Sequence, residues 1–317
     1  MRLALLLTLA PAFPAGAFEL AFPVACDLGD TCHIQNAFDH DAGPDATDAT
    51  CGSLAYDGHD GTDIALPTIA AMRQGVNVLA AAPGTITGVR DVMPDILISD
   101  PTAPALNGRD CGNGVVIDHG DGWETQYCHM MKGSVAVSTG QIVSAGTPLG
   151  QIGLSGNTEF PHLHLSVRRN GVEVDPFAPD ATDCGPLPND DLWLDDVTLT
   201  PGGILDIGIS TAVPDYAAIK AGLPDPNTLP DTAPALVVWA YTFGTKAGDM
   251  IDLSLTGPDE VVIADTIPLD RAQAQSFRAI GRKLRDVWPH GTYQGSAGLT
   301  RNGETVDQSE VTLTITP

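Results

Sequence analysis

The sequence has few positive charges, few aromatic residues and no long apolar run after its N-terminus. Its 317 residues include 15 Lys and Arg against 40 Asp and Glu, which gives a formal net charge of −25. This excess argues against a nucleic acid or an anionic lipid surface as a partner, because both are themselves negatively charged. Aromatic residues make up 5%, whereas Gly (34) and Pro (25) are plentiful. That balance favours turn-rich β structure over helical bundles.

The one short apolar run lies within the first 17 residues, after a single basic residue and before the small-residue site at 15–17. This pattern is typical of a secretory signal peptide, cleaved before Phe18. The run is too short to span a bilayer, although an uncleaved N-terminal anchor is the alternative interpretation. We therefore expect a periplasmic or secreted protein without stable membrane insertion.

Cysteine is absent after residue 184, and the six cysteines are Cys26, Cys32, Cys51, Cys111, Cys128 and Cys184. An even number in an exported chain indicates disulfide bonds. A cysteine zinc cluster is the weaker alternative, because no pair has the C-x-x-C spacing. The sequence alone does not determine the pairing, and our expectation is Cys26–Cys32, Cys51–Cys111 and Cys128–Cys184.

Short strand-like runs separated by Gly occupy residues 58–180 and predict an antiparallel all-β domain, a sheet or a barrel-like fold. Residues 68–73 predict one brief helix, and residues 91–112 a long loop. The predicted strands are 63–66, 76–82, 85–90, 114–118, 124–129, 141–143, 148–152 and 162–168. A polar segment with three cysteines, residues 18–57, is expected to wrap this domain.

A Pro-, Gly- and Asp-rich linker at 181–190 separates a second predicted domain, residues 191–317. Its strand-length segments predict a β-sandwich, of an immunoglobulin-like kind. The expected strands are 197–200, 204–209, 235–242, 250–255, 260–264, 291–300 and 310–316, while the periodicity of 270–286 does not decide between helix and strand. Trp239 and Trp288 are interpreted as core residues. The role of this domain stays open, with the docking of a protein partner as one candidate.

Two polar residues four positions apart, His59 and Asp63, lie in a segment rich in Gly and Asp. Gly58 and Gly61 make a helix unfavourable, so we expect a loop that enters a strand at Asp63. Gly61 permits the tight backbone path that would let both side chains converge. The alternative is an ordinary turn without ligand function.

The motif His162-Leu163-His164 lies in a predicted strand, where alternate side chains share a face about 6–7 Å apart. One imidazole can then bind a metal while the other reaches the substrate, and the intervening Leu163 points into a core. Two histidines on an exposed strand are the alternative. A further imidazole, His129, ends the strand 123–129. Imidazoles and a carboxylate are the ligands of catalytic Zn²⁺ sites that keep one position open.

With these motifs the sequence resembles the lysostaphin-type zinc endopeptidases of peptidoglycan. The resemblance covers residues 55–178: His-x-x-x-Asp at 59–63, Gly-Asn-Gly at 112–114, Tyr-Cys-His at 127–129, the glycines of 140–153, and Pro-His-Leu-His at 161–164. It implies that His59, Asp63 and His164 ligate one zinc ion, and that His129 and His162 form the catalytic pair. Residues 158–160 and 165–166 depart from the usual family pattern, which affects the substrate subsites rather than the ligands.

The resemblance implies an exported zinc metallo-endopeptidase that hydrolyses peptide cross-links of peptidoglycan with metal-activated water. No His-Glu-x-x-His motif supplies a glutamate base, so one of His129 and His162 is expected to take the proton, and the sequence leaves open which one. The alternatives are an inactive relative that regulates a cell-wall amidase, and a secreted protease of proteins. A lipoyl-type carrier domain is excluded, because Lys132 lacks the required flanking residues. His119 is interpreted as structural, and His33, His40 and His290 have no motif context.

Overall fold

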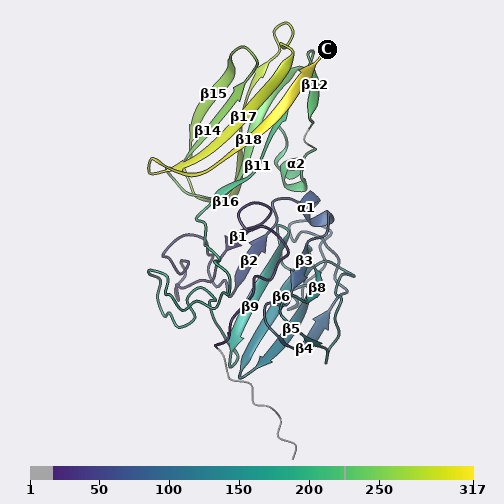
Figure 1. Ribbon diagram of the computed structural model, residues 1–317, viewed down its shortest axis with the longest axis vertical. Coiled ribbons are helices and arrows are strands. Elements are labelled where there is room, and N and C mark those ends of the chain that lie inside the picture. Colours follow the sequence, from purple (N-terminus) through teal and green to yellow (C-terminus); the bar gives the residue numbers. More distant parts are fainter. Residues whose placement is uncertain (1–16, 225) are drawn as a thin grey trace, which may run out of the picture.

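The computed structural model of the protein describes residues 17–224 and 226–317, so the predicted signal peptide, except for residue 17, lies outside the described residues. The described chain is almost entirely β structure, with two sheet-containing halves one above the other along the long axis (Figure 1). Within this part of the chain, no helix has the length and apolar character needed to cross a membrane.

The N-terminal half is built on one large antiparallel sheet with the strand order β1-β2-β9-β6-β5-β4-β7, to which β10 adds beside β9. A small second sheet pairs β3 with β8. The strands are β1 (His33–Asn36), β2 (Thr62–Ala65), β3 (Asn77–Leu79), β4 (Gly84–Arg90), β5 (Asn113–Gly120), β6 (Trp123–Met130), β7 (Ile142–Val143), β8 (Pro148–Gln151), β9 (His162–Arg169) and β10 (Val172–Glu173).

The predicted all-β fold of this half is confirmed, and its strands match the predicted ones to within a few residues. In the central strand β9, Leu163 and Leu165 are fully buried and belong to one hydrophobic cluster that runs through the whole half. The helix α1 (Ile69–Arg73) begins after Thr68, whose hydroxyl accepts a hydrogen bond from the backbone N–H of Ala71 at 3.1 Å. This N-cap explains why so short a segment is helical.

The polar segment 18–57 was expected to wrap the first domain, but part of it belongs to the sheet itself. Residues 33–36 form the edge strand β1, which pairs antiparallel with β2 and places Asn36 opposite Asp63. The period-2 pattern of so short a strand is too weak to recognise in a segment dominated by Asp, Gly and Cys. The segment therefore contributes backbone hydrogen bonds and one side chain at the candidate site.

The predicted disulfide pairing is correct for Cys26–Cys32 and wrong for the other four cysteines, which pair as Cys51–Cys184 and Cys111–Cys128. The physical reason is the register of β5 and β6. The register of this hairpin shifts between Asn113 and Val115, and beside the shift the Cα atoms of Cys111, just before β5, and Cys128, within β6, lie 4.7 Å apart. The other disulfide joins the polar segment 18–57 to the chain that follows the sheet. Next to it, the Gly185 N–H donates to the Ala49 carbonyl at 2.8 Å.

The C-terminal half consists of a three-stranded sheet, β11-β13-β16, and a five-stranded sheet, β12-β18-β17-β14-β15. Its elements are β11 (Gly203–Ser210), α2 (Tyr216–Ala221), β12 (Thr228–Pro230), β13 (Ala235–Thr245), β14 (Met250–Thr256), β15 (Val261–Pro268), β16 (Gln273–Lys283), β17 (Gly291–Arg301) and β18 (Glu304–Thr316). One hydrophobic cluster draws residues from both sheets, as expected for a two-sheet sandwich.

Several expectations for this half can now be resolved. The undecided segment 270–286 contains a strand, β16, whereas the strand predicted at 197–200 is absent from the structure. Trp239 and Trp288 are buried, as predicted. The helix α2 had no counterpart in the prediction, and β12 pairs in parallel with β18. The immunoglobulin-like character and the exact domain limits stay predictions.

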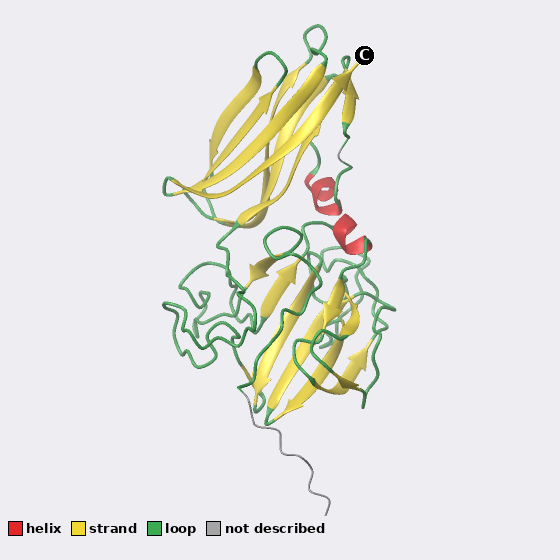
Figure 2. Cartoon of the chain, in the orientation of Figure 1, coloured by secondary structure: helices red, strands yellow, loops and turns green. Residues whose placement is uncertain are grey.

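Both short helices lie where the two halves meet (Figure 2). The junction also contains aromatic and polar contacts: the His33 ring lies 4.3 Å from the Phe243 ring, and the Gln35 side-chain amide donates to the Ala274 carbonyl at 3.1 Å. The edge of the N-terminal sheet is thus packed against the other half.

Candidate active site

Strand register brings the sequence motifs together. Asp63 on β2 is the cross-strand neighbour of His164 on β9, and Cys128 on β6 is the neighbour of His164 on the other side. Directly opposed residues in antiparallel strands have Cβ atoms about 5 Å apart. His129, which follows Cys128, and His162, two residues before His164, therefore lie in the same neighbourhood of the sheet.

His59, Asp63 and His164 form a compact cluster, in which each offers one ligand atom and all three atoms lie within 4.8 Å of one another. Asp63 Oδ1 is 3.1 Å from His59 Nε2 and 2.9 Å from His164 Nδ1, and the two nitrogens are 3.1 Å apart. His59 reaches this position from the loop before β2. The structure brings together the three residues that the sequence suggested as ligands.

Gly61 allows the loop to approach β9 closely. A Cβ atom at this position would lie 2.5 Å from the Leu165 carbonyl oxygen and 2.8 Å from Cε1 of the His164 ring. The first of these contacts is with a backbone atom, which cannot move aside as the end of a flexible side chain can. The close approach of His164 and Leu165 therefore favours glycine at this position.

The outer atom of each ligand side chain has a hydrogen-bond partner. The Nδ1–H of His59 donates to the Ala37 carbonyl at 2.6 Å, and Nδ2 of Asn36 donates to Asp63 Oδ2 at 2.8 Å. These bonds leave the lone pairs of His59 Nε2 and Asp63 Oδ1 directed into the cluster. Such outer partners fix the tautomer and orientation of metal ligands.

His164 has its Nε2 atom 3.0 Å from the Ser166 hydroxyl and 3.3 Å from Asp60 Oδ1. With the proton on Nε2, the Nδ1 atom presents its lone pair to the cluster. Two imidazole nitrogens and one carboxylate oxygen thus converge without a protein donor between them. This donor set fits a Zn²⁺ ion with an open coordination position.

The cluster favours positive charge. Burial raises the pKa of Asp63, but the charges of His162 and His59 and hydrogen bonds from His162 and His164 outweigh it and hold that pKa well below its usual value. Burial likewise lowers the pKa of His164, but Asp60 and Asp63 outweigh it and raise that pKa to about 9. The carboxylates therefore hold a proton on His164 when no metal ion competes for the site.

The remaining two histidines, His129 and His162, lie side by side with ring centroids 4.5 Å apart. The Nδ1–H of His129 donates to the Ser155 carbonyl at 2.8 Å, and that of His162 donates to the Phe160 carbonyl at 2.9 Å. Each ring is therefore fixed through its Nδ1 atom. His162 Nε2 lies 3.4 Å from Asp63 Oδ1, so this ring borders the ligand cluster.

His129 is held uncharged and in an unusual backbone conformation. Burial is the main cause that keeps its pKa well below the usual value, with the charges of His162 and His164 acting in the same direction. Its φ angle is +60°, in the left-handed region that costs a non-glycine residue about 1 kcal/mol or more. The Cys111 carbonyl, next to the Cys111–Cys128 disulfide, accepts its N–H at 2.8 Å.

Residues that orient the ligands escaped the sequence-based interpretation. Ser166 could have been found, because it lies two residues beyond His164 on a strand and so shares its face. Asn36 and Ala37 act from a different strand, and no local pattern indicates them. The other histidines are placed elsewhere: His119 bonds to the Pro83 carbonyl and the Thr125 hydroxyl, both at 2.7 Å, which supports its structural interpretation.

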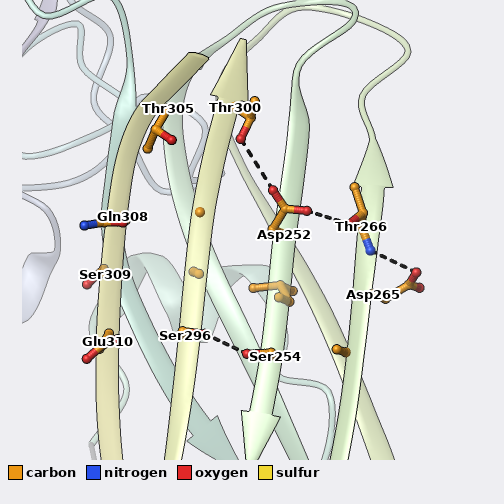
Figure 3. Close-up of a pocket in the computed structure, with 14 residues that line it drawn as sticks. Asp252, Ser254, Asp265, Thr266, Ser296, Thr300, Thr305, Gln308, Ser309 and Glu310 are labelled. Atoms are coloured by element: carbon orange, nitrogen blue, oxygen red, sulfur yellow. Dashed lines mark hydrogen bonds between the residues drawn. The ribbon is translucent and has the colours of Figure 1, made fainter. Parts of the chain in front are cut away.

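A groove of about 720 Å³ lies on the five-stranded sheet of the C-terminal half, away from the cluster (Figure 3). Its polar side chains bond to one another, as in the Ser254–Ser296 contact at 2.7 Å and the bond from Thr266 to Asp252. Its described lining residues include no His, Lys, Arg or Cys. Among these lining residues, the ionisable side chains are the carboxylates of Asp252, Asp265 and Glu310, so the groove offers no imidazole beside them.

The His/Asp/His cluster could hold a metal ion, and two further imidazoles lie beside it. Residues 57–176 match the family model described as Peptidase family M23. The chain thus contains a peptidase domain of the M23, lysostaphin-like family, and the family prediction from the sequence is confirmed.

Curated relatives match over the same region. The chain is 34% identical over 122 residues to the DD-carboxypeptidase/endopeptidase Mpg of Neisseria meningitidis, which covers 38% of this chain and 22% of the relative. It is 32% identical over 116 residues to the peptidoglycan DD-endopeptidase ShyA of Vibrio cholerae, covering 37% and 21%. The matched region is therefore only about a fifth of the length of these relatives.

Among solved structures, the catalytic domain of lysostaphin from Staphylococcus simulans is 23% identical, with a TM-score of 0.28, and the match covers 39% of this chain and 82% of that one. The catalytic domain of the prophage-encoded M23 protein EnpA from Enterococcus faecalis is 24% identical, with a TM-score of 0.35 and coverage of 52% and 100%.

Proposed function

We propose that the protein is an exported zinc-dependent endopeptidase that hydrolyses peptide cross-links of bacterial peptidoglycan. The observation that carries the proposal is the convergence of His59, Asp63 and His164, with their lone pairs directed inward, beside the imidazoles of His129 and His162. The names of the relatives Mpg and ShyA support the substrate class.

In this proposal His59, Asp63 and His164 hold one zinc ion. A bound zinc ion would supply Lewis-acid polarisation of the scissile carbonyl and would lower the pKa of a bound water to about 7. The hydrogen bonds from Asn36 and to Ala37 keep the ligand atoms in place whether or not substrate is present.

We assign the role of general base to His129. Its ring is uncharged because of burial, and the bond from Nδ1–H to Ser155 leaves Nε2 able to accept a proton. The same carbonyl stabilises the imidazolium that results, since a charged donor strengthens the hydrogen bond.

His162 is then the donor that stabilises the developing oxyanion or protonates the leaving amine. Its Nε2 atom lies 3.4 Å from Asp63 Oδ1, at the edge of the ligand cluster. The Phe160 carbonyl fixes the other ring nitrogen and so holds the ring in this orientation.

The test combines metal content with digestion of purified sacculi by the full chain. We expect about one zinc per chain and release of uncross-linked peptides. His129→Gln should retain zinc and lose activity by a factor of about 100 or more, whereas Asp63→Asn should lose both. His290→Gln, at an exposed histidine of the other half, is the matched control and should behave as wild type.

Three outcomes would contradict the proposal. A protein that binds no zinc, or that binds it and leaves sacculi intact, fits a non-catalytic regulator. Cleavage of casein with no cleavage of sacculi fits a protease of proteins. Retained activity in His129→Gln would remove the assigned base.

A further inference from the structure

An open cavity of about 440 Å³ lies between the two halves of the chain. The N-terminal half contributes Asn36 from β1 and Phe160 from the loop before β9. The C-terminal half contributes Tyr216 and Lys220 from α2 and Arg271 from the loop before β16. Both halves are therefore needed to form it.

The cavity borders the candidate active site through two of these residues. Phe160 packs its ring 4.4 Å from the ring of His162 and accepts the hydrogen bond from His162 Nδ1. Asn36 donates to Asp63 at 2.8 Å. A substrate bound across His162 would extend directly into this space.

The cavity carries positive charge in a chain that has little. Arg271 is exposed and forms no hydrogen bond or ion pair within residues 17–224 and 226–317. Lys220 donates to the backbone carbonyl of Glu159 at 3.0 Å, and its ammonium lies 5.8 Å from the ring centroid of Tyr216. Glu159 is the one acidic residue among the described lining residues.

The Tyr216 side chain, which lines the cavity, packs against the C-terminal half. The Tyr216 ring stacks on Phe277 of β16 with centroids 5.8 Å apart and an interplanar angle of 11°. Lys220 is anchored to the loop that carries Glu159 and Phe160, which joins α2 to the N-terminal half. Preformed cavities of this kind bind ligands with less loss of conformational entropy.

We propose that this cavity is a substrate subsite, in which Arg271 and Lys220 bind a carboxylate of the peptide beside the bond that is cleaved. A guanidinium presents two parallel donors to a carboxylate, and Lys220 adds a second cation. Tyr216 and Phe160 contact the apolar part of the same peptide. The subsite deepens the proposed function and rests on it, and it assigns a role to the C-terminal half.

The test uses the full chain with two synthetic cross-linked stem peptides, one with free carboxylates and the other with the same groups converted to carboxamides. Binding is measured by calorimetry in the His129→Gln background, which prevents turnover, and KM and kcat are measured in the otherwise unchanged chain. We expect the free carboxylates to bind about 5-fold or more tightly than the carboxamides.

Arg271→Gln should remove this preference by weakening binding of the acidic peptide alone, with the change in KM rather than kcat. Lys220→Gln should act in the same direction, and Lys220→Arg should restore the preference. Arg285→Gln is the matched control, because Arg285 is an exposed cation that lines a different pocket.

Equal binding of the two peptides, or equal behaviour of Arg271→Gln and Arg285→Gln, would overturn the subsite while leaving the peptidase proposal intact. Charge-dependent binding with no cleavage by the unchanged chain would instead contradict the peptidase proposal. Failure of both peptides to bind would overturn the subsite.

Discussion

Asn36 donates a hydrogen bond to Oδ2 of Asp63 at 2.8 Å, and this bond turns Oδ1 of the same carboxylate toward His59 and His164. The donor comes from the edge strand β1, in a segment outside the region matched by the peptidase family. A residue outside the family domain therefore orients a candidate metal ligand inside it.

Replacing Asn36 with Ala should weaken zinc binding about 10-fold to 100-fold, because outer partners of metal ligands contribute on that scale. The measurement is competition with a chromogenic chelator at pH 7.5. Asn77→Ala, at an exposed position of β3, is the control and should leave affinity unchanged. Wild-type affinity in Asn36→Ala would show that the bond has no orienting role.

Replacing Gly61 with Ala should displace the His164 ring or the Leu165 carbonyl, because the new Cβ would lie within 3 Å of both. We expect a loss of zinc affinity and a destabilisation of about 1–3 kcal/mol, as for other overpacked sites. Gly61 is not among the positive-φ glycines, whereas Gly133 has a φ of +79° and open space around its Cα, so comparison with Gly133→Ala separates crowding from backbone strain. Equal effects of the two substitutions would exclude crowding as the cause.

Removing the Cys111–Cys128 disulfide should reduce activity as well as stability. The bond holds Cys128, the residue before His129, beside Cys111, whose carbonyl accepts the His129 N–H, and His129 itself has a strained φ. Removal of a native disulfide costs about 2–5 kcal/mol. The double replacement Cys51→Ala with Cys184→Ala is the comparison and should affect stability alone, since both cysteines lie outside the strands β2, β6 and β9. Denaturant unfolding and sacculi digestion at low temperature distinguish the two effects.

The stability of the protein should fall as the pH drops below about 6.5. Burial lowers the pKa of His33 to about 4, an effect that the hydrogen bond with Gln35 only partly opposes. Between pH 6.5 and about pH 4, His33 is therefore protonated in the unfolded chain and neutral in the folded chain. The contribution of His33 to the free energy of unfolding is fully present above pH 6.5. It decreases by about 2 kcal/mol between pH 7 and pH 5.

His33 packs on Phe243 across the junction, so the same titration weakens the contact between the halves. Urea unfolding at pH 7 and pH 5 checks the prediction. His33→Gln should flatten this part of the profile, whereas His290→Gln, at an exposed site, should not. An unchanged profile in His33→Gln would contradict the assignment.

The parts of the fold that local patterns encode could be predicted from the sequence. Strand β9 begins with alternating His and Leu, and glycines mark the turn around Gly61. Both patterns are local, so the sequence alone was enough to predict the strand and the candidate ligands. The two long-range disulfides could not be predicted. One depends on the β5–β6 register, and the other on where the polar segment 18–57 meets the chain that follows the sheet. Asn36 and Arg271 depend on contacts between distant segments, which a single sequence does not reveal.

The Cys51–Cys184 bond closes a covalent ring of chain that contains His59, Asp63, His129, His162 and His164. The long loop at 91–112 lies inside this ring, and its C-terminal end is held further by the bond between Cys111 and Cys128. A protease that cuts the loop therefore produces two pieces that stay joined under non-reducing conditions, with every member of the site still in one molecule. The chain can be cut within this loop without separating into two molecules.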